Sequence, residues 1–334
     1  MVKRMFLLAV LALSCSLTAS FAGEKPKAAL IFKSAGNAFG EKMMEGFKTA
    51  VEEKGGECVL RAPDQPTAEA QAAIIEELMT QGVAVIALSA NDPDALRPVL
   101  KKARRAGIRV ITVDSPINAQ SRDVHINQVD SELIGLMLVQ AAYEMSGGKG
   151  DVAILSATSR AANQNAWIER MKKAAEDEKY KDMKIVAVAY GDDLRDKSIS
   201  ETEALLEAHP DLKVIIAPTT VGIAAAGKAL TDKKLRDKVY LTGLGLPSEM
   251  AEYIENGVCP WMYLWNPMDL GYLAGYIASE MIEGSMSGTR GEYINAGRLG
   301  ARIVVSAPDE GTEIMLGAPF RFDKSNIDEW KKVY

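Results

Sequence analysis

Cysteine and histidine are scarce in this 334-residue chain, which contains three cysteines and two histidines. So few thiols do not build a disulfide framework, and Cys58 and Cys259 are expected to be small buried hydrophobic residues. Neither His125 nor His209 has a glutamate or a second histidine at metal-ligand spacing, so we expect no metal site. The sequence therefore argues against disulfide scaffolds and zinc enzymes.

Motifs of nucleotide binding and of nucleophilic catalysis are also missing. No P-loop occurs, and the glycines of "SAGNAFG" (34–40) do not have the spacing of a dinucleotide-binding loop. In "GSMSG" (284–288) a methionine occupies the nucleophile position. Because no nucleophile, base and orienting group come together, we expect a protein without catalytic residues and without a cofactor.

Positive charge is not concentrated anywhere in the sequence. Lysine and arginine number 39 against 45 aspartates and glutamates, and the formal net charge is −6. The absence of a basic stripe argues against nucleic acid or anionic lipid as a partner. The acidic pairs at 192–193 and 52–53 are interpreted as solvated faces of a loop and a helix.

The N-terminus has the pattern of a secretory leader. A basic pair at positions 3–4 precedes the apolar run 5–13, and small residues follow. The predicted signal peptide is 1–22, with cleavage after Ala22, which implies a periplasmic protein. A lipid anchor on Cys15 is the less favoured alternative, since Ala12 stands where such signals usually have leucine.

Short apolar runs alternate with amphipathic helical patterns along the rest of the chain. Gly82 and Gly107 close two of these helices. Repeated strand and helix units of this kind predict an α/β fold, with parallel sheets covered by helices. In the first half the predicted strands are 28–32, 58–60, 83–88 and 110–113, and the predicted helices are 39–54, 67–81 and 94–105.

The pattern restarts after "VHINQ" (124–128), so we expect a second lobe of the same kind. Its predicted strands are 152–155, 185–188, 214–216 and 240–242, and its predicted helices are 130–145, 163–178, 197–208, 222–230 and 248–256.

The next segment is predicted to be a strand that ends at Pro267, followed by a long apolar helix. Because this segment is too short to form a third domain, we expect it to return to the first lobe. The chain then crosses between the lobes at about 127, 266 and 300, and these strands form a hinge. The predicted N-terminal lobe is 23–128 plus about 267–300, and the C-terminal lobe is 129–266 plus about 301–334.

Polar side chains follow the predicted strands, at the edge where ligands collect in open parallel sheets. Each has a simpler explanation: Lys33 as a solvated charge, Asp114 as a turn cap, Asn163 as a helix N-cap. Together, one cation, carboxylates, amides, hydroxyls and an aromatic ring suit a small polyhydroxylated ligand. The strand-end candidates are Lys33, Ser34, Asn37, Ser89, Asn91, Asp92, Asp114, Ser115, Ser159, Asn163, Gln164, Pro218, Thr219, Thr220, Trp265 and Asn266.

Eight segments of the chain carry a resemblance to one protein family. They are "FKSAGNAFG", "SANDPDAL", "VITVDSP", "HINQ", "NQNAW", "IIAPTTVGIAAA", "LTGLGLPSEM" and "YLWNPMDLGYLA". With the leader and the two-lobed order, they resemble the pentose/hexose class of periplasmic substrate-binding proteins, closest to its rhamnose-binding and autoinducer-2-binding branch. The resemblance implies a monomer that closes on a sugar and delivers it to an ABC permease and its ATPase. Presentation to a chemoreceptor and an exported sugar-active α/β enzyme are the alternatives.

The resemblance also assigns site residues. Lys33, Asp114, Gln164 and Pro218 match positions where autoinducer-2 proteins bond their furanosyl ligand. This chain departs from that pattern with Asn163 in place of an aspartate and Thr220 in place of an alanine. "APTTVGIAAA" and "LWNPMDLGYLA" resemble the rhamnose-binding proteins, so L-rhamnose or a related deoxyhexose is the leading ligand and autoinducer-2 the alternative. Trp265, Phe39 or Leu246 would supply an apolar wall for its methyl group. The predicted ligand-binding residues are Lys33, Asn37, Phe39, Asp114, Asn163, Gln164, Pro218, Thr220, Leu246, Trp265 and Asn266.

Overall fold

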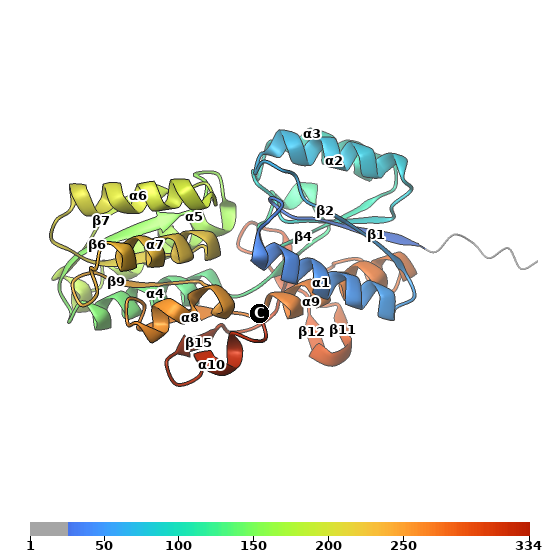
Figure 1. The fold of residues 1–334 in the computed structure, drawn as a ribbon. Coiled ribbons are helices and arrows are strands. Elements are labelled where there is room, and N and C mark those ends of the chain that lie inside the picture. Colours follow the sequence, from blue (N-terminus) through green and yellow to red (C-terminus); the bar gives the residue numbers. More distant parts are fainter. Residues whose placement is uncertain (1–25) are drawn as a thin grey trace, which may run out of the picture.

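The computed structural model describes residues 26–334, so the predicted leader and Cys15 lie outside the described residues. The chain forms two lobes that lie side by side, each a sheet covered by helices (Figure 1). The prediction of an α/β fold with two doubly wound lobes is confirmed.

The first lobe is built on a seven-stranded sheet in the order β13-β14-β5-β4-β3-β1-β2. Neighbouring strands are parallel, except that β13 runs antiparallel to β14. The strands are β1 (Lys27–Ile31), β2 (Glu57–Arg61), β3 (Val85–Leu88), β4 (Arg109–Val113), β5 (Val124–Asn127), β13 (Val305–Ser306) and β14 (Thr312–Met315).

Alternate residues of β1 face the two helical layers of this lobe. Ala28 and Leu30 belong to the core that contains residues of α1 and α9, whereas Ala29 and Ile31 belong to the core that contains residues of α2 and α3. A strand buried on both faces reads as a continuous apolar run, which is why 28–32 was recognisable in the sequence. The helices are α1 (Ala38–Glu53), α2 (Ala68–Thr80), α3 (Arg97–Arg105) and α9 (Pro267–Glu283), with a short 3-10 helix η1 (Ala119–Ser121).

Helices α1 and α9 approach each other closely through glycine. A Cβ atom on Gly46 would overlap the backbone oxygen of Met268, and one on Gly271 would overlap the backbone oxygen of Met43. Because no side chain fits between the backbones there, the return of the chain to the first lobe depends on these two glycines.

The second lobe has a four-stranded parallel sheet in the order β7-β6-β8-β9. Helix α4 packs on α5, and α7 packs on both α6 and α8. The strands are β6 (Gly150–Ser156), β7 (Met183–Tyr190), β8 (Leu212–Ala217) and β9 (Tyr240–Gly243). The helices are α4 (Ser131–Met145), α5 (Ala162–Ala174), η2 (Glu178–Tyr180), α6 (Arg195–Ala208), α7 (Thr220–Asp232) and α8 (Pro247–Glu255).

Two small antiparallel ribbons complete the fold. Strand β10 (Trp261–Leu264) pairs with β15 (Phe320–Asp323) and is joined to the second sheet by a bridge between Leu244 and Tyr263. The remaining elements are β11 (Tyr293–Asn295), η3 (Gly297–Leu299), β12 (Ala301–Ile303) and α10 (Ile327–Trp330).

The chain passes between the lobes in three places, after β5, after β10 and after β14. The third crossing corrects an expectation. It lies between Met315 and Phe320 rather than near residue 300, because β14 first pairs with β5 and extends the first sheet. Residues 301–316 therefore lie with the first lobe, and only the end of the chain lies with the second.

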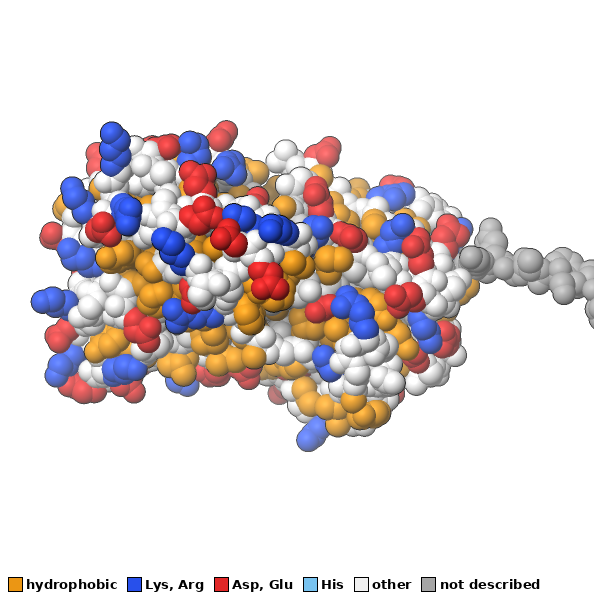
Figure 2. Space-filling model, turned by 60° about the horizontal axis from the view of Figure 1, so that its bottom comes forward, with side chains coloured by type: hydrophobic (Ala, Val, Ile, Leu, Met, Phe, Trp, Pro, Cys, Tyr) orange, Lys and Arg blue, Asp and Glu red, His pale blue; other side chains and the backbone are white. Residues whose placement is uncertain are grey.

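In the described part of the chain, no helix combines the length and the apolar character needed to cross a membrane. Acidic and basic side chains are mixed over the face shown in Figure 2. That face carries no extended surface of one charge.

Candidate functional site

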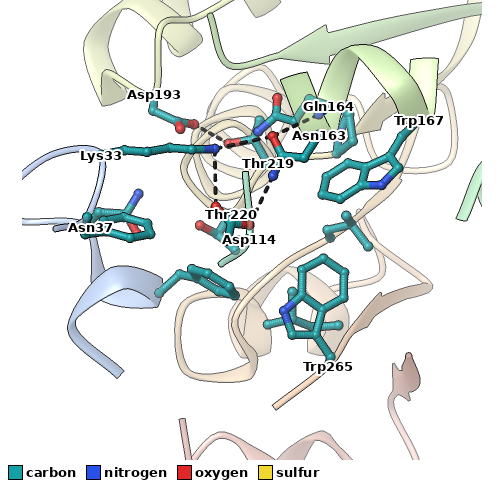
Figure 3. A pocket seen from close by; sticks show the side chains of 15 residues that line it. Lys33, Asn37, Asp114, Asn163, Gln164, Trp167, Asp193, Thr219, Thr220 and Trp265 are labelled. Atoms are coloured by element: carbon teal, nitrogen blue, oxygen red, sulfur yellow. Dashed lines mark hydrogen bonds and ion pairs between the residues drawn. The ribbon is translucent and has the colours of Figure 1, made fainter. Parts of the chain in front are cut away.

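A cavity lies between the lobes, at the carboxyl ends of strands from both sheets (Figure 3). Its walls combine charged, amide, hydroxyl and aromatic side chains. The lining residues are Phe32, Lys33, Asn37, Phe39, Asp114, Asn163, Gln164, Trp167, Asp193, Pro218, Thr219, Thr220, Leu244, Leu264 and Trp265.

Lys33 and Asp114 form a buried ion pair on the first lobe. Lys33 lies two residues after β1 and Asp114 directly after β4, and these strands flank β3 in the sheet. Their side chains are 9% and 7% exposed, and Lys33 Nζ lies 3.3 Å from Asp114 Oδ2. Lys33 is therefore not the solvated surface charge that its position could equally have indicated, because a buried ammonium needs such a partner.

The backbone and the neighbours of Asp114 fix its carboxylate. Its φ of 64° is in the left-handed region, which aspartate tolerates better than most residues. Ser89 Oγ donates to Asp114 Oδ2 at 2.7 Å, and Asn163 Nδ2 donates to Asp114 Oδ1 at 3.0 Å. Both carboxylate oxygens are thus held in place before any ligand is considered.

Asn163 connects the two lobes. Its Oδ1 accepts a hydrogen bond from Lys33 Nζ at 3.3 Å, and its Nδ2 donates to Asp114. Asn163 is not the N-cap of α5, which is Ala161; it lies in the first turn of the helix, and its side chain points across the cleft (Figure 3). Lys33, Asp114 and Asn163 form a closed triangle of direct contacts between the lobes.

Gln164 is held from behind by its own lobe. Its Oε1 accepts hydrogen bonds from Ser156 Oγ and from the backbone N–H of Ala157, both at 2.7 Å. Since the oxygen is occupied, the amide nitrogen is the group that Gln164 can offer to the cavity.

The N-terminus of α7 and the loop after β7 complete the polar wall. Thr219 is the N-cap residue of α7, and its Oγ1 donates to Asp193 Oδ1. Burial raises the pKa of the Asp193 carboxyl, and nearby Lys33 opposes this shift. The solvated acidic loop predicted at 192–193 is therefore half wrong. Asp192 pairs with Lys197 at the surface, whereas the side chain of Asp193 points into the cavity.

Aromatic rings form the opposite wall. Trp265 contacts Phe39 edge-on, with ring centroids 6.1 Å apart, and Trp167 with centroids 5.9 Å apart. The indole Nε1 of Trp265 is buried and has no hydrogen-bond partner among residues 26–334. The wall offers apolar surface to the cavity.

Two predicted site residues do not line the cavity. Asn266 is the N-cap of α9, where its Oδ1 accepts from the backbone N–H groups of Met268 and Asp269. Leu246 is buried at the start of α8, and Leu244, two residues earlier, takes its place in the wall. Of the other lining residues, Thr219 was among the strand-end candidates, whereas Phe32, Trp167, Asp193, Leu244 and Leu264 were not predicted.

An ion pair joins the lobes near the cavity. Arg160 Nε lies 2.7 Å from Asp92 Oδ2, with Arg160 largely exposed. The Arg160 guanidinium is the main cause that lowers the pKa of Asp92 to about 2.

The described residues hold no group of three or more His, Cys, Asp or Glu side chains placed to bind a metal ion. Cys58 and Cys259 are both free thiols; Cys259 is buried as expected and Cys58 is half-buried. Burial raises the pKa of the Cys58 thiol to about 12, so it is not a reactive thiolate.

The chain is similar to proteins of known binding function. A family profile described as "Periplasmic binding protein domain" matches residues 28–286. A solved structure of an ABC transporter solute-binding protein from Clostridium phytofermentas with bound L-rhamnose is 48% identical, has a TM-score of 0.91, and covers 94% of this chain and 100% of that one. LsrB from Clostridium saccharobutylicum, in complex with AI-2, is 25% identical with a TM-score of 0.86, over 91% of this chain and 99% of that one.

A curated relative is more distant. The D-ribose/D-allose-binding protein of Pseudomonas aeruginosa is 29% identical over 206 residues, which span 58% of this chain and 62% of that protein. The relatives are binding proteins of transport systems rather than enzymes.

Proposed function

The chain belongs to the periplasmic binding protein family as a sugar-binding component of ABC transport, and from this premise we propose that its ligand is L-rhamnose or a related deoxyhexose. The ligand is held between the lobes by the cavity residues and presented to a membrane permease. The observation that carries the proposal is the triangle of Lys33, Asp114 and Asn163, in which the polar groups of both lobes converge.

The mechanism is closure of the hinge around the sugar. Ligand hydroxyls can take the place of the direct contacts of Asn163 with Lys33 and Asp114, since each hydroxyl both donates and accepts. A ligand that bonds both lobes at once binds the closed arrangement better than an open one and shifts the population toward it. The permease then recognises the closed lobes.

The aromatic wall supports the choice of a deoxy sugar. Phe39, Trp167 and Trp265 offer apolar surface to a methyl group and to the C–H face of the ring. The 48% identity to the L-rhamnose-bound relative supports the same choice.

Autoinducer-2 is the second candidate, because LsrB shares the fold at 25% identity. Asn163 and Thr220 argue against it. An amide in place of a carboxylate removes a charge from the wall, and threonine adds a methyl and a hydroxyl group where that family has alanine.

A matched pair of sugars tests the proposal. L-rhamnose is 6-deoxy-L-mannose, so the two sugars differ only at carbon 6, which is a methyl group in L-rhamnose and a CH₂OH group in L-mannose. If the aromatic wall receives that methyl group, isothermal titration calorimetry will show L-rhamnose binding at least tenfold tighter than L-mannose, about 1.4 kcal/mol or more, because the added hydroxyl is buried without a partner.

The protein is unfolded, washed and refolded before titration to remove co-purified sugar, and the released ligand is identified by mass spectrometry. D-Ribose and autoinducer-2 serve as controls. Tighter binding of either control than of L-rhamnose would contradict the proposed ligand.

A further inference from the structure

Asp193 is the acidic side chain that the second lobe contributes to the lining of the sugar cavity. It lies three residues after β7, next to Asp192, and both aspartates have a left-handed backbone, with φ of 53° and 54°. Such a conformation is costly for residues other than glycine, and costly conformations are concentrated at binding sites. The turn directs Asp192 to Lys197 at the surface and Asp193 to the cavity.

The turn that carries Asp193 is attached to the end of β6. The backbone N–H of Asp192 donates to the carbonyl oxygen of Ala157 at 3.1 Å. The N–H of the same Ala157 donates to Gln164 Oε1 at 2.7 Å. The Asp193 carboxylate, which is an acceptor, and Gln164 Nε2, which is a donor, are therefore held on one common support.

One oxygen of the Asp193 carboxylate is available to a ligand. Thr219 Oγ1 donates to Oδ1, whereas Oδ2 accepts no hydrogen bond from residues 26–334. Oδ2 is not one of the fully buried atoms that lack a partner, so a ligand can reach it. Burial raises the pKa of the Asp193 carboxyl, and a ligand hydroxyl that donates to Oδ2 would stabilise its charged form.

Lys33 acts on Asp193 across the cleft without direct contact. The Lys33 ammonium lies 3.3 Å from Asp114 Oδ2 and 3.3 Å from Asn163 Oδ1, which leaves one of its three N–H donors for a ligand. Among residues 26–334, no lysine or arginine forms an ion pair with Asp193, although Lys33 is near enough to oppose the rise of its pKa. A hydroxyl suits this arrangement, because its oxygen accepts from an ammonium while its hydrogen is donated to a carboxylate.

We propose that Asp193 is a specificity-determining residue, whose Oδ2 accepts a hydrogen bond from one sugar hydroxyl that also accepts from Lys33. This inference rests on the proposed function, since it assigns one contact of the sugar in that cavity. It narrows the substrate class to sugars with a free hydroxyl at that position. A hydrogen or a methoxy group there leaves the carboxylate without its donor, and a phosphate there is repelled by it.

A cycle of protein variants and sugar analogues tests the proposal. Isothermal titration calorimetry on the refolded full chain compares L-rhamnose with monodeoxy analogues that each lack one ring hydroxyl. In the wild type, loss of the hydroxyl bonded to Asp193 should weaken binding about 100-fold, because two charged groups lose their partner. In Asp193→Gly the same loss should weaken binding only about tenfold, because the contact with Lys33 alone remains.

Asp192→Gly is the matched control. Glycine is unstrained at positive φ, so both glycine variants keep the turn, but Asp192 pairs with Lys197 at the surface. This control should bind every analogue as the wild type does. Asp193→Asn keeps the shape of the side chain and removes its charge; it serves if Asp193→Gly does not fold, and it should reduce the effect of that one hydroxyl about threefold.

The outcomes separate this inference from the proposed function. If each hydroxyl matters as much in Asp193→Gly or Asp193→Asn as in the wild type, Asp193 contacts none of them, and the proposed function stands. An equal change in Asp192→Gly would assign the effect to the turn and would also overturn the role of the Asp193 carboxylate. If the wild type does not bind L-rhamnose, the proposed function fails, and the same cycle is measured with the sugar released from the denatured protein and its monodeoxy analogues.

Discussion

The two lobes supply different chemistry to one cavity. The first lobe brings a complete ion pair, Lys33 and Asp114, fixed by Ser89. Apart from Asp193, the polar groups of the second lobe are neutral, with Asn163 and Gln164 from the start of α5 and hydroxyls from the start of α7. Lys33 and Asp114 lie on the same lobe, so Lys33 keeps its carboxylate partner when the lobes move apart. Neutral amides exchange one hydrogen-bond partner for water at little cost.

The largest loss of sugar affinity is expected when the carboxylate of the first lobe's ion pair is removed. Asp114→Asn keeps the shape and tolerates the positive φ, but it leaves the Lys33 ammonium buried without its carboxylate. Sugar affinity should fall at least 100-fold, about 3 kcal/mol, by titration calorimetry. Asp114→Ala should likewise abolish the sugar-induced change in tryptophan fluorescence, and it should lower the temperature of thermal unfolding, because Lys33 stays buried without its carboxylate and alanine tolerates the positive φ poorly. Wild-type affinity in either variant would show that the pocket is misplaced.

The second largest effect is expected on folding stability, which should fall at acidic pH because of a buried histidine in the first lobe. The first lobe buries His125, whose Nδ1 lies 3.0 Å from Thr112 Oγ1, and burial followed by Arg122 lowers its pKa to about 3, with Thr112 and Asp309 opposing. A depressed folded pKa gives stability that is full above the unfolded value near 6.5 and is lost as pH falls toward 3. Between pH 7 and pH 5 the unfolding free energy should drop by about 2 kcal/mol.

Urea unfolding at the two pH values measures this drop. His125→Asn is the control and should show a smaller pH dependence than the wild type. An identical pH dependence in both proteins would show that His125 is not the group responsible.

A smaller effect is expected from a neutral group of the second lobe. Gln164→Met removes the amide offered to the cavity, so affinity should fall about tenfold, the worth of one neutral hydrogen bond. The variant also leaves Ser156 Oγ and the Ala157 N–H without their acceptor, so thermal unfolding should occur at a lower temperature. A loss as large as that of Asp114→Asn would contradict the division of roles between the lobes.

The smallest change in sugar affinity is expected from Arg160, whose ion pair joins the two lobes. Arg160→Gln removes the ion pair with Asp92 between the lobes, but Arg160 is largely exposed. Affinity should change by no more than about threefold, and the difference should disappear in 1 M salt. A large, salt-independent loss would show that Arg160 contacts the ligand.

Much of the site was predictable because the residues that line the cavity directly follow strands of the two sheets. Lys33 and Asp114 come directly after runs that read as buried parallel strands, and Pro218 and Thr220 follow β8. Asp193 obeys the same rule, since it lies three residues after β7, but "GDD" reads equally well as a solvated turn. Only the packing of α7 against that loop, which brings Thr219 to Asp193, distinguishes the two interpretations.

Errors arose where one residue has two plausible roles. Asn266 stands at the end of a crossing strand, as a ligand contact would, yet its side chain caps α9. Trp167 fits an apolar helical stripe, and nothing in the spacing shows that this stripe faces the cleft. The late crossing was missed because β13 has only two residues and β14 four, too short to give a period.

The contact of α1 with α9 has a consequence for how the protein is made. Gly46 and Gly271, which let the two backbones touch, are separated in the sequence by all four strands of the second lobe's sheet, β6 to β9. An emerging polypeptide can complete the second lobe's sheet before residues 267–316 exist, but its first lobe has no α9 to close against. Helix α9 can therefore close the first lobe only after the second lobe's sheet has been synthesised.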